Sequence, residues 1–275
     1  DVRGLKYLDI NKFKIFEIDT PKLNRSILLP FTILKVFFLT IKSLLLLKKE
    51  KIQILISTGG YMSLPLCLAG KILNIKIFLL EPNMTIGRAN KFFLNFCEKI
   101  ICYSNNINGL PNKFKNKIEI SSPFIRRQYY EKKFKENNNE IFTIMIVGGS
   151  QGAQIFDEII HESIVKISKI KPLKIIHQTS QKKVNFFKKF YSENNLENIV
   201  FNFDNNLDML ISQSDLCITR AGASSLAEIA HLNVPFIAIP LPTSKDNHQL
   251  ENANYYRDKD CCWIINQKSF DRQKF

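Results

Sequence analysis

The sequence predicts an α/β protein of two lobes, each built on a parallel β-sheet. The chain has 275 residues, 45% of them hydrophobic, which suffices for two domains with apolar cores. Short runs rich in Ile, Val and Leu alternate with helix-period segments, as in parallel sheets covered by helices on both faces. One polar, charge-rich stretch at residues 121–140 interrupts this alternation. We therefore expect lobes at residues 1–125 and 126–275, with a cleft between them.

The first half opens on a long apolar segment, residues 27–47. It is long enough to span a membrane, but Pro30, Lys35 and Lys42 interrupt it, and a Lys near the centre of a span costs about 2.5–3.5 kcal/mol. We expect instead an amphipathic helix that is mostly buried and touches a membrane surface, with a true span as the alternative. Beyond it, strands are expected at 52–57, 75–81 and 99–104, and helices at 64–73 and 87–98.

The alternation restarts after the polar stretch. In residues 153–167, apolar side chains recur with the 3.6-residue period of a helix. Further helices are expected at 223–232 and 246–258. Strands are expected at 141–147, 173–178, 198–203, 215–219, 235–240 and 262–266. Both halves thus follow the Rossmann-like pattern of strand, loop and helix.

The net charge of +14 is unevenly distributed along the chain. Residues 1–125 contain 19 Lys and Arg against 8 Asp and Glu, whereas residues 126–275 contain 20 against 17. A basic half suggests an anionic partner, such as phospholipid, nucleic acid or a diphosphate. Compositional drift in a Lys-rich sequence is the alternative.

The six cysteines do not indicate a metal site. No C-x-x-C pair occurs, and no Cys and His spacing is typical of zinc. Most lie within apolar runs, so we expect buried free thiols in a reducing compartment. The first ten residues lack the apolar core of a signal peptide.

A glycine-rich loop at residues 148–153, "GGSQGA", joins a predicted strand to a predicted helix. Glycines let a ligand approach the backbone amides closely, and the helix directs its unpaired N–H groups and positive dipole end at the same place. The loop therefore favours an anion, best a phosphate. It matches neither the Walker A pattern nor G-x-G-x-x-G. A tight turn without a ligand is the alternative.

A second candidate site lies in "TRAGASSLAEIA", residues 219–230. Gly222 follows a predicted strand, and the next helix is expected to begin near Ser224 or Ser225. Glu228 then has two interpretations. Ser225-x-x-Glu228 matches a capping box, in which Glu228 binds a backbone N–H locally. Alternatively, Glu228 accepts hydrogen bonds from sugar hydroxyls while nearby amides meet phosphate at the carboxyl ends of the strands.

Three more polar loops follow predicted strands: "TGGYMSLP" (58–65), "EPNMTIGRAN" (81–90) and "PLPTSKDNHQLENA" (240–253). Together with "VGGSQGA", "HQTS" and "RAGASSLAEIA", they occur in the order found in the MurG family. Each motif alone is weakly specific, but six in order across residues 58–253 are highly specific. The chain therefore resembles this family of N-acetylglucosaminyltransferases, which convert lipid I to lipid II in bacterial peptidoglycan synthesis.

The resemblance implies a two-lobed GT-B glycosyltransferase. In such enzymes the C-terminal lobe binds UDP-N-acetylglucosamine, and the N-terminal lobe meets the lipid-linked acceptor. It implies a peripheral protein on the cytoplasmic face of the bacterial inner membrane, with an anionic membrane surface as partner and no cofactor or metal. Another UDP-sugar enzyme of the same build, such as a lipid glycosyltransferase or an epimerase, is the alternative. Nucleic-acid binding is not expected, because the aromatic residues fall mostly in core-like runs.

The resemblance also assigns roles to individual residues. Asn83 is similar to a donor-sugar contact, and Gln249 to the Gln that meets the sugar hydroxyls. The diphosphate would meet Ser150, flanked by Gly149 and Gly152. The start of the donor-binding helix would comprise Ala223, Ser224, Ser225, Leu226, Ala227 and Glu228, with Glu228 on the ribose.

Arg126 resembles the Arg that follows the interlobe proline, but Pro-Phe-Ile-Arg is one residue longer than the family pattern, so Arg127 competes. Gly59, Gly60 and Tyr61 are expected on the acceptor side.

The chain departs from the family pattern at both ends. The family begins with a strand and a Gly-rich loop ending in His, and no such motif occurs in these 275 residues. The usual C-terminal helices also have no counterpart. We expect the general base to be a His or carboxylate. His161 and His231 are predicted to be structural, His177 to lie at a strand end beside the cleft, and His248 in a polar loop. The base is therefore not assigned.

Overall fold

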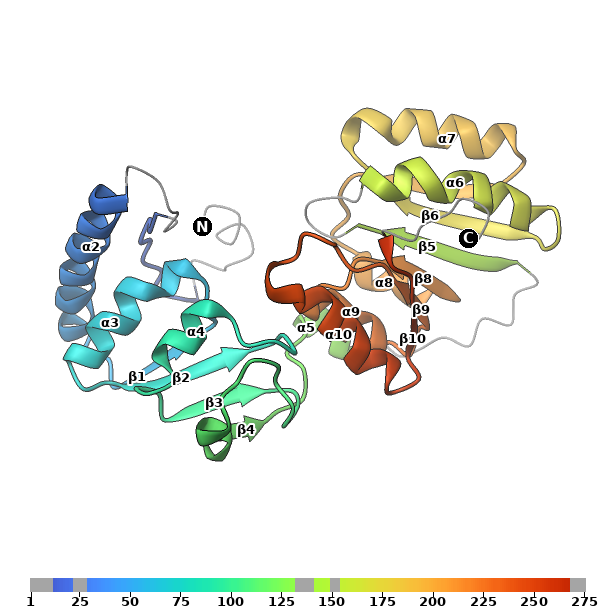
Figure 1. Ribbon diagram of the computed structural model, residues 1–275. Coiled ribbons are helices and arrows are strands. Elements are labelled where there is room, and N and C mark those ends of the chain that lie inside the picture. The colour runs from blue at the N-terminus through green and yellow to red at the C-terminus, as the bar shows by residue number, and fades with distance from the viewer. Residues whose placement is uncertain (1–11, 22–28, 132–140, 149–153, 268–275) are drawn as a thin grey trace. The chain divides into compact units, whose positions relative to one another are not determined.

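The computed structural model describes residues 12–21, 29–131, 141–148 and 154–267 (Figure 1). The chain divides into two compact units, the first comprising Asp1–Glu81 and Ile86–Ser121, and the second Pro82–Thr85 and Ser122–Phe275. Each unit contains a parallel sheet, so the predicted α/β fold is confirmed. The sequence pattern does not predict that Pro82–Thr85 groups with the second unit. The assignment of acceptor and donor roles to the two halves stays a prediction.

The first unit is built on a four-stranded parallel sheet in the order β1-β2-β3-β4. Its strands are β1 (Ile54–Ser57), β2 (Lys76–Glu81), β3 (Lys99–Cys102) and β4 (Ile118–Ile120). Its helices are α2 (Leu29–Lys49), η1 (Tyr61–Ser63), α3 (Leu64–Ile72), α4 (Arg88–Phe93) and η2 (Asn112–Lys117). Pro65 falls in the first turn of α3, where a missing N–H costs nothing.

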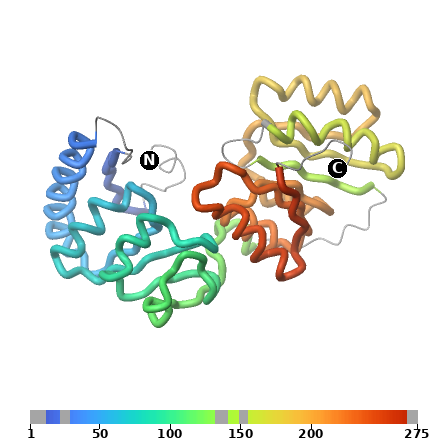
Figure 2. The backbone as a smooth tube through the Cα atoms, in the orientation of Figure 1, coloured from blue at the N-terminus to red at the C-terminus, as the bar shows by residue number. Residues whose placement is uncertain are grey.

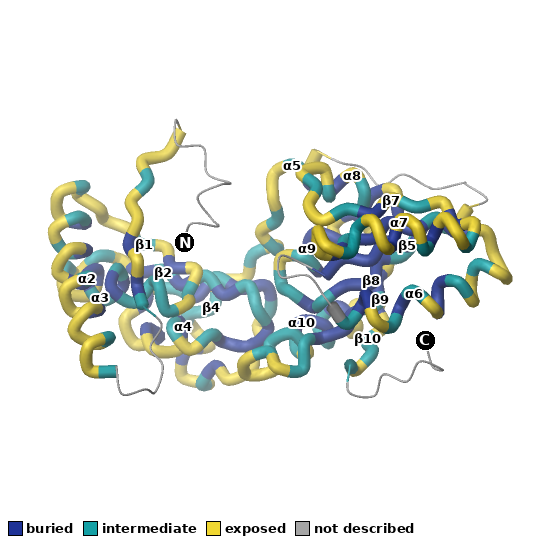
Figure 3. The backbone as a smooth tube through the Cα atoms, turned by 90° about the horizontal axis from the view of Figure 1, so that it is seen from above, coloured by how far each residue is buried: buried dark blue, intermediate teal, exposed yellow. Residues whose placement is uncertain are grey.

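Helix α2 presents its apolar side chains outward, contrary to the prediction of a mostly buried helix. Only 17% of the most apolar 18-residue stretch of this helix is buried. It packs against α3 through a stripe that includes Thr40 and Ser43, whose hydroxyls donate to the carbonyls of Val36 and Leu39. These two hydroxyls face α3, and their hydrogen bonds to carbonyls of α2 itself allow them to be buried there. Its outer surface is largely exposed in Figure 3 and carries Phe31, Ile33, Leu34, Phe37, Phe38, Ile41 and Leu45.

The second unit is built on a six-stranded parallel sheet in the order β10-β9-β8-β5-β6-β7. Its strands are β5 (Phe142–Val147), β6 (Leu173–Gln178), β7 (Glu197–Phe201), β8 (Leu216–Thr219), β9 (Phe236–Ala238) and β10 (Cys262–Ile264). Its helices are α5 (Arg127–Tyr130), α6 (Gln154–Ser168), η3 (Gln181–Lys183), α7 (Val184–Glu193), α8 (Leu207–Ser212), α9 (Ala223–His231), η4 (Lys245–Asn247) and α10 (His248–Arg257). The strand order reverses between β5 and β8, as in doubly wound folds.

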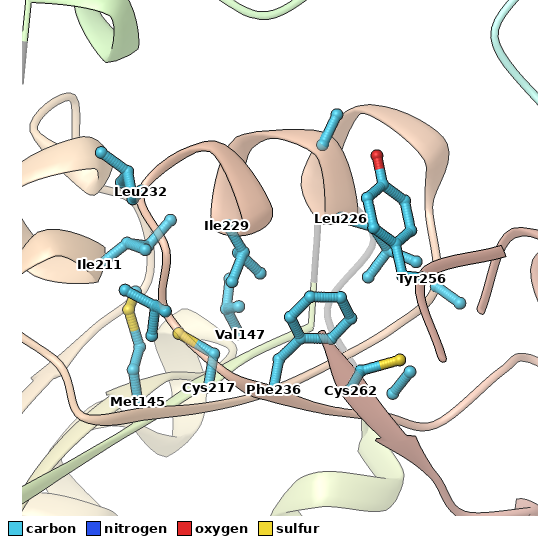
Figure 4. Packing of buried hydrophobic residues seen from close by; sticks show 14 of the residues in the cluster. Met145, Val147, Ile211, Cys217, Leu226, Ile229, Leu232, Phe236, Tyr256 and Cys262 are labelled. Carbon is cyan, nitrogen blue, oxygen red and sulfur yellow. The ribbon is translucent and has the colours of Figure 1, made fainter. Parts of the chain in front are cut away.

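Alternate residues of these strands point to opposite faces of the sheet and pack in two separate cores. The strand sequences are therefore apolar almost throughout. Ile144 and Ile146 of β5 pack with α6 and α7 on one face of the sheet. Met145 and Val147 pack with α8, α9 and α10 on the other face, around Phe236 (Figure 4). The backbone trace shows the same layering, with α6 and α7 on one side of β5 and β6 (Figure 2).

Most elements form close to their predicted limits, but the helix expected at 87–98 ends at Phe93, and strand β4 and helices α7 and α8 are not predicted. The expected strand at 141–147 is β5, and the expected helix at 153–167 is α6. No helix is predicted at residues 184–193 or 207–212, where α7 and α8 lie. All six cysteines are free, and all except Cys261 are buried, so buried free thiols are confirmed for five.

Candidate functional site

The loops that follow β5 and β8 begin side by side at the switch point of the second sheet. Val147 at the end of β5 pairs in parallel with Thr219 at the end of β8. In doubly wound sheets, ligands bind where the loops after two such strands diverge. Gly148 is buried here, whereas Gly149, Ser150 and Gly152 lie outside the described residues.

Helix α9 begins at Ala223, the first residue of the helix expected at 223–232, and not at Ser224 or Ser225. Gly222 is its N-cap, Ala223 its first residue, and no side chain caps it. Its first intrahelical bond runs from the Leu226 N–H to the Gly222 carbonyl, so Ser224 and Ser225 contribute first-turn amides. The capping-box interpretation is therefore wrong, because it requires Ser225 at the N-cap, whereas Ser225 is the third residue of α9 and Glu228 lies six positions beyond the actual N-cap, Gly222.

Glu228 binds Arg126 instead. Arg126 donates from Nε to Oε1 at 2.8 Å and from Nη2 to Oε2 at 2.9 Å, a bidentate pair across 102 positions of sequence. The Glu228 side chain is 7% exposed and that of Arg126 48%. Arg126 also donates to the Tyr129 hydroxyl at 2.8 Å, and burial, followed by the nearby Glu228 charge, raises the pKa of Tyr129.

Arg127, the competing arginine, lies apart from this pair. Its side chain is 92% exposed and contacts Glu131 of the same turn at 3.3 Å. The extra residue before Arg126 therefore leaves Arg126, and not Arg127, beside Glu228.

Asn252 of α10 joins two loops of the same unit. Its Oδ1 accepts the Met84 N–H at 2.9 Å. Its Nδ2 donates to Asn83 Oδ1 at 3.1 Å and to the Ala221 carbonyl at 3.2 Å. These bonds bring Asn83 together with the loop that starts α9. Asn252 is 2% exposed, and its place in "PLPTSKDNHQLENA" does not by itself predict a role for it.

Gln249 supports the loop after β9. Its Oε1 accepts the Leu241 N–H at 2.9 Å, and the side chain is half-buried. His248, expected in a loop, is the first residue of α10, and its Nδ1 lies 2.7 Å from the Lys245 carbonyl oxygen. Gln249 and Asn252 thus come from the first turns of one helix.

The residues expected on the acceptor side belong to the first unit. Gly59 and Gly60 both have positive φ, at 78° and 77°, and lead into Tyr61 of η1. A Cβ on Gly59 would lie 3.0 Å from Asn90 Nδ2, and the φ of 78° strains any other residue, so this position favours glycine. Asn90 donates to Glu81 Oε2 at 3.0 Å, and the Gly87 N–H donates to the same oxygen at 2.7 Å.

The buried pair of Glu81 and Asn90 was not singled out from sequence. They are the first and last residues of "EPNMTIGRAN", and nothing in this loop pattern indicates that its two ends meet.

His177 is a core residue, not a residue at the edge of a cleft. It is 1% exposed, its Nδ1 lies 3.0 Å from the Tyr191 hydroxyl, and its Nε2 lies 3.3 Å from Asp157 Oδ1. Asp157 also accepts from Thr179 Oγ1 at 2.9 Å and meets Lys183 Nζ at 3.2 Å. Burial would raise the pKa of Asp157, but the hydrogen bonds from His177, Thr179 and Lys183 outweigh it and hold that pKa below its ordinary value.

The other two histidines lie in helices, as predicted. His161 in α6 meets Phe187 and Phe190 edge-on, and His231 in α9 meets Tyr130. Within the four described ranges, no three His, Cys, Asp or Glu side chains gather as a group that could hold a metal ion.

Two protein-family models match the chain. Residues 7–102 match the N-terminal domain of glycosyltransferase family 28, and residues 143–274 match its C-terminal domain. A protein from Pelagibacter ubique, named UDP-N-acetylglucosamine–N-acetylmuramyl-(pentapeptide) pyrophosphoryl-undecaprenol N-acetylglucosamine transferase, is 46% identical over 99% of this chain and 77% of its own length. The chain belongs to the MurG family.

Other relatives agree with this assignment. A Rickettsia felis protein of the same name is 32% identical over 100% of the chain and 79% of its own length. The crystal structure of Acinetobacter baumannii MurG superposes with a TM-score of 0.77 and 27% identity, covering 99% of this chain and 75% of that one. The chain is thus a glycosyltransferase with the MurG fold, and the predicted family, fold class and enzyme class are confirmed.

Proposed function

We propose that this MurG-family chain transfers N-acetylglucosamine from UDP-N-acetylglucosamine to lipid I, the undecaprenyl-diphosphate-linked muramoyl pentapeptide, to give lipid II. One observation carries the donor half of the proposal. The pairing of β5 with β8 starts the glycine-rich loop and the α9 loop together, at the place where doubly wound sheets bind nucleotides. The names of the relatives support the choice of sugar and acceptor.

The α9 amides would stabilise the diphosphate of the donor. A hydroxyl of the lipid-linked sugar loses its proton to a general base and attacks the anomeric carbon of N-acetylglucosamine, the bond to the diphosphate oxygen breaks, and UDP leaves with growing negative charge. The first-turn N–H groups of α9, at Ala223, Ser224 and Ser225, have no side-chain cap and carry the positive end of the helix dipole. Ser150 and the glycines beside it would contribute from the other loop.

Glu228 would hold the ribose through the lone pairs that Arg126 leaves unused. An ionised carboxylate offers about four acceptor positions, and the bidentate Arg126 occupies two of them. Asn83 and Gln249 would meet the sugar. Gly59, Gly60 and Tyr61 would serve the acceptor.

The outer face of α2 would place the protein on the cytoplasmic face of the inner membrane as a peripheral protein. Phe31, Phe37 and Phe38 are 71%, 58% and 60% exposed. The basic residues of the helix, Lys35, Lys42, Lys48 and Lys49, are exposed as well. Among the described residues, α2 is the one helix long and apolar enough to span a bilayer, but its buried stripe on α3 favours lying on the surface.

Replacing Phe37 and Phe38 by Ser should release the protein from anionic membranes. Each exposed ring that enters the bilayer interface contributes up to about 1.5–3 kcal/mol, so we expect at least a tenfold weaker partition. Co-sedimentation with phosphatidylglycerol vesicles measures it. Phe186→Ser, which removes a 59% exposed ring from α7 in the second unit, is the control. Equal vesicle binding by all three proteins would exclude α2 as the membrane surface.

Calorimetry with three ligands tests the donor assignment. We expect UDP-N-acetylglucosamine to bind, UDP-glucose to bind more weakly, and single-stranded DNA not to bind. Transfer is then followed with a labelled donor and lipid I. Binding of DNA alone, or equal binding of both sugar nucleotides, would contradict the proposal.

A further inference from the structure

The hydrogen bonds of Asn252 determine which way its amide points. Met84 N–H can only donate, so the atom of Asn252 that meets it at 2.9 Å must be the oxygen. The Ala221 carbonyl can only accept, so the atom that meets it at 3.2 Å must be the nitrogen. Two backbone groups of fixed polarity therefore orient this amide, which is 2% exposed.

The orientation of Asn252 in turn determines that of Asn83. Because Asn252 presents its NH₂ group, the Asn83 atom 3.1 Å away must be the acceptor Oδ1. Reversing the Asn83 amide would set two NH₂ groups against each other. The Asn83 NH₂ group consequently lies on the side of its amide turned away from Asn252.

We propose that Asn252 is a positioning residue that makes Asn83 a hydrogen-bond donor toward the donor sugar. The inference rests on the proposed function, in which Asn83 contacts that sugar. Asn83 then recognises an acceptor oxygen of the sugar, and Asn252 acts only through Asn83 and the Ala221 loop. Asn252 contributes to recognition of the sugar, and not of the uridine diphosphate.

The test compares binding of UDP-N-acetylglucosamine with binding of UDP. Asn83→Asp keeps an acceptor for Asn252 but replaces the NH₂ group by an oxygen. We expect it to weaken UDP-N-acetylglucosamine binding about tenfold, as much as Asn83→Ala does, and to change UDP binding less than about twofold. Asn252→Ser and Asn252→Asp should each lower the preference for the sugar nucleotide similarly. In the Asn83→Ala background, either change should lower it no further.

Asn254→Asp is the matched control, because Asn254 lies two residues along the same helix and on a different face. Urea unfolding of every variant separates loss of fold from loss of recognition, and Asn83, which is half-buried, is the safer site. If Asn83→Asp binds the sugar nucleotide as the native protein does, or if the Asn252 effects persist in Asn83→Ala, the inference is overturned. A native protein that binds UDP-N-acetylglucosamine no better than UDP-glucose would instead overturn the proposed function.

Discussion

Replacing Glu228 by Ala is expected to weaken UDP-N-acetylglucosamine binding by at least about 100-fold. The variant loses two hydrogen bonds from ribose hydroxyls to a charged acceptor, each contributing about 1.5–3 kcal/mol. The fold should tolerate the change, because Arg126 is 48% exposed and water replaces its partner. Calorimetry gives the dissociation constant, and urea unfolding gives the stability.

Two further variants separate the ribose contact from the ion pair. Glu228→Gln keeps the size of the side chain and one acceptor oxygen, so its loss of binding should be intermediate, about tenfold. Arg126→Ala leaves the buried Glu228 carboxylate without its bidentate partner and should lower the free energy of unfolding by about 1.5–3 kcal/mol. Native affinity in Glu228→Ala would show that Glu228 does not hold the ribose.

Replacing Asp157 by Ala is expected to lower the free energy of unfolding by about 3 kcal/mol, because His177 and Thr179 lose a buried partner and Lys183 an ion pair. The residues join α6 to β6 and to η3 beside the second core. Urea unfolding at neutral pH measures the difference, and a loss below about 1 kcal/mol would show that the cluster contributes little.

The same cluster predicts a dependence on acid pH. The folded protein holds the pKa of Asp157 below its ordinary value, so the stability gained from the ionised carboxylate is complete above the unfolded pKa, about 4. It is lost as pH falls through the lower folded pKa. Asp157→Asn keeps an acceptor for Thr179 but cannot ionise. Between pH 5 and 3, the urea concentration at the unfolding midpoint should therefore fall less for Asp157→Asn than for the native protein. The difference should correspond to the stability that the ionised Asp157 carboxylate contributes.

The strands other than β4, and helices such as α6 and α9, could be predicted from sequence because their patterns are local. β5 and α6 were located within one residue by runs of Ile, Val and Phe. Helix α8 was missed because its six residues are too few for a helical period to stand out, whereas α7 buries Phe187 and Tyr191 at helical spacing and could have been predicted. Helix α2 was found, but its orientation was not. Periodicity shows that one face is apolar, and only packing against α3 shows which face is inside.

For the candidate site, too, some features could be predicted from sequence and others could not. Gly222, the glycine-rich loop and Glu228 were located from sequence because a glycine between a strand and a helix restricts what can follow. No sequence pattern indicates that Glu228 meets Arg126 rather than Ser225, because the two partners lie 102 residues apart. His177 was expected at a cleft edge, since a polar residue near a strand end resembles a site residue. Its burial depends on Tyr191 and Asp157, which come from other elements.

The sequence by itself determined the two parallel-sheet units, the family and the loops that bear its motifs, because hydrophobic periodicity and glycine placement act over a few residues. Only the tertiary structure decided that α2 turns its phenylalanines outward, that His177 is a core residue and that Asn252 orients Asn83. These three features depend on hydrogen bonds and packing between segments that are distant in the chain. The free energy of burying a side chain depends on which groups contact it in the folded protein, and its sequence neighbours do not determine those groups.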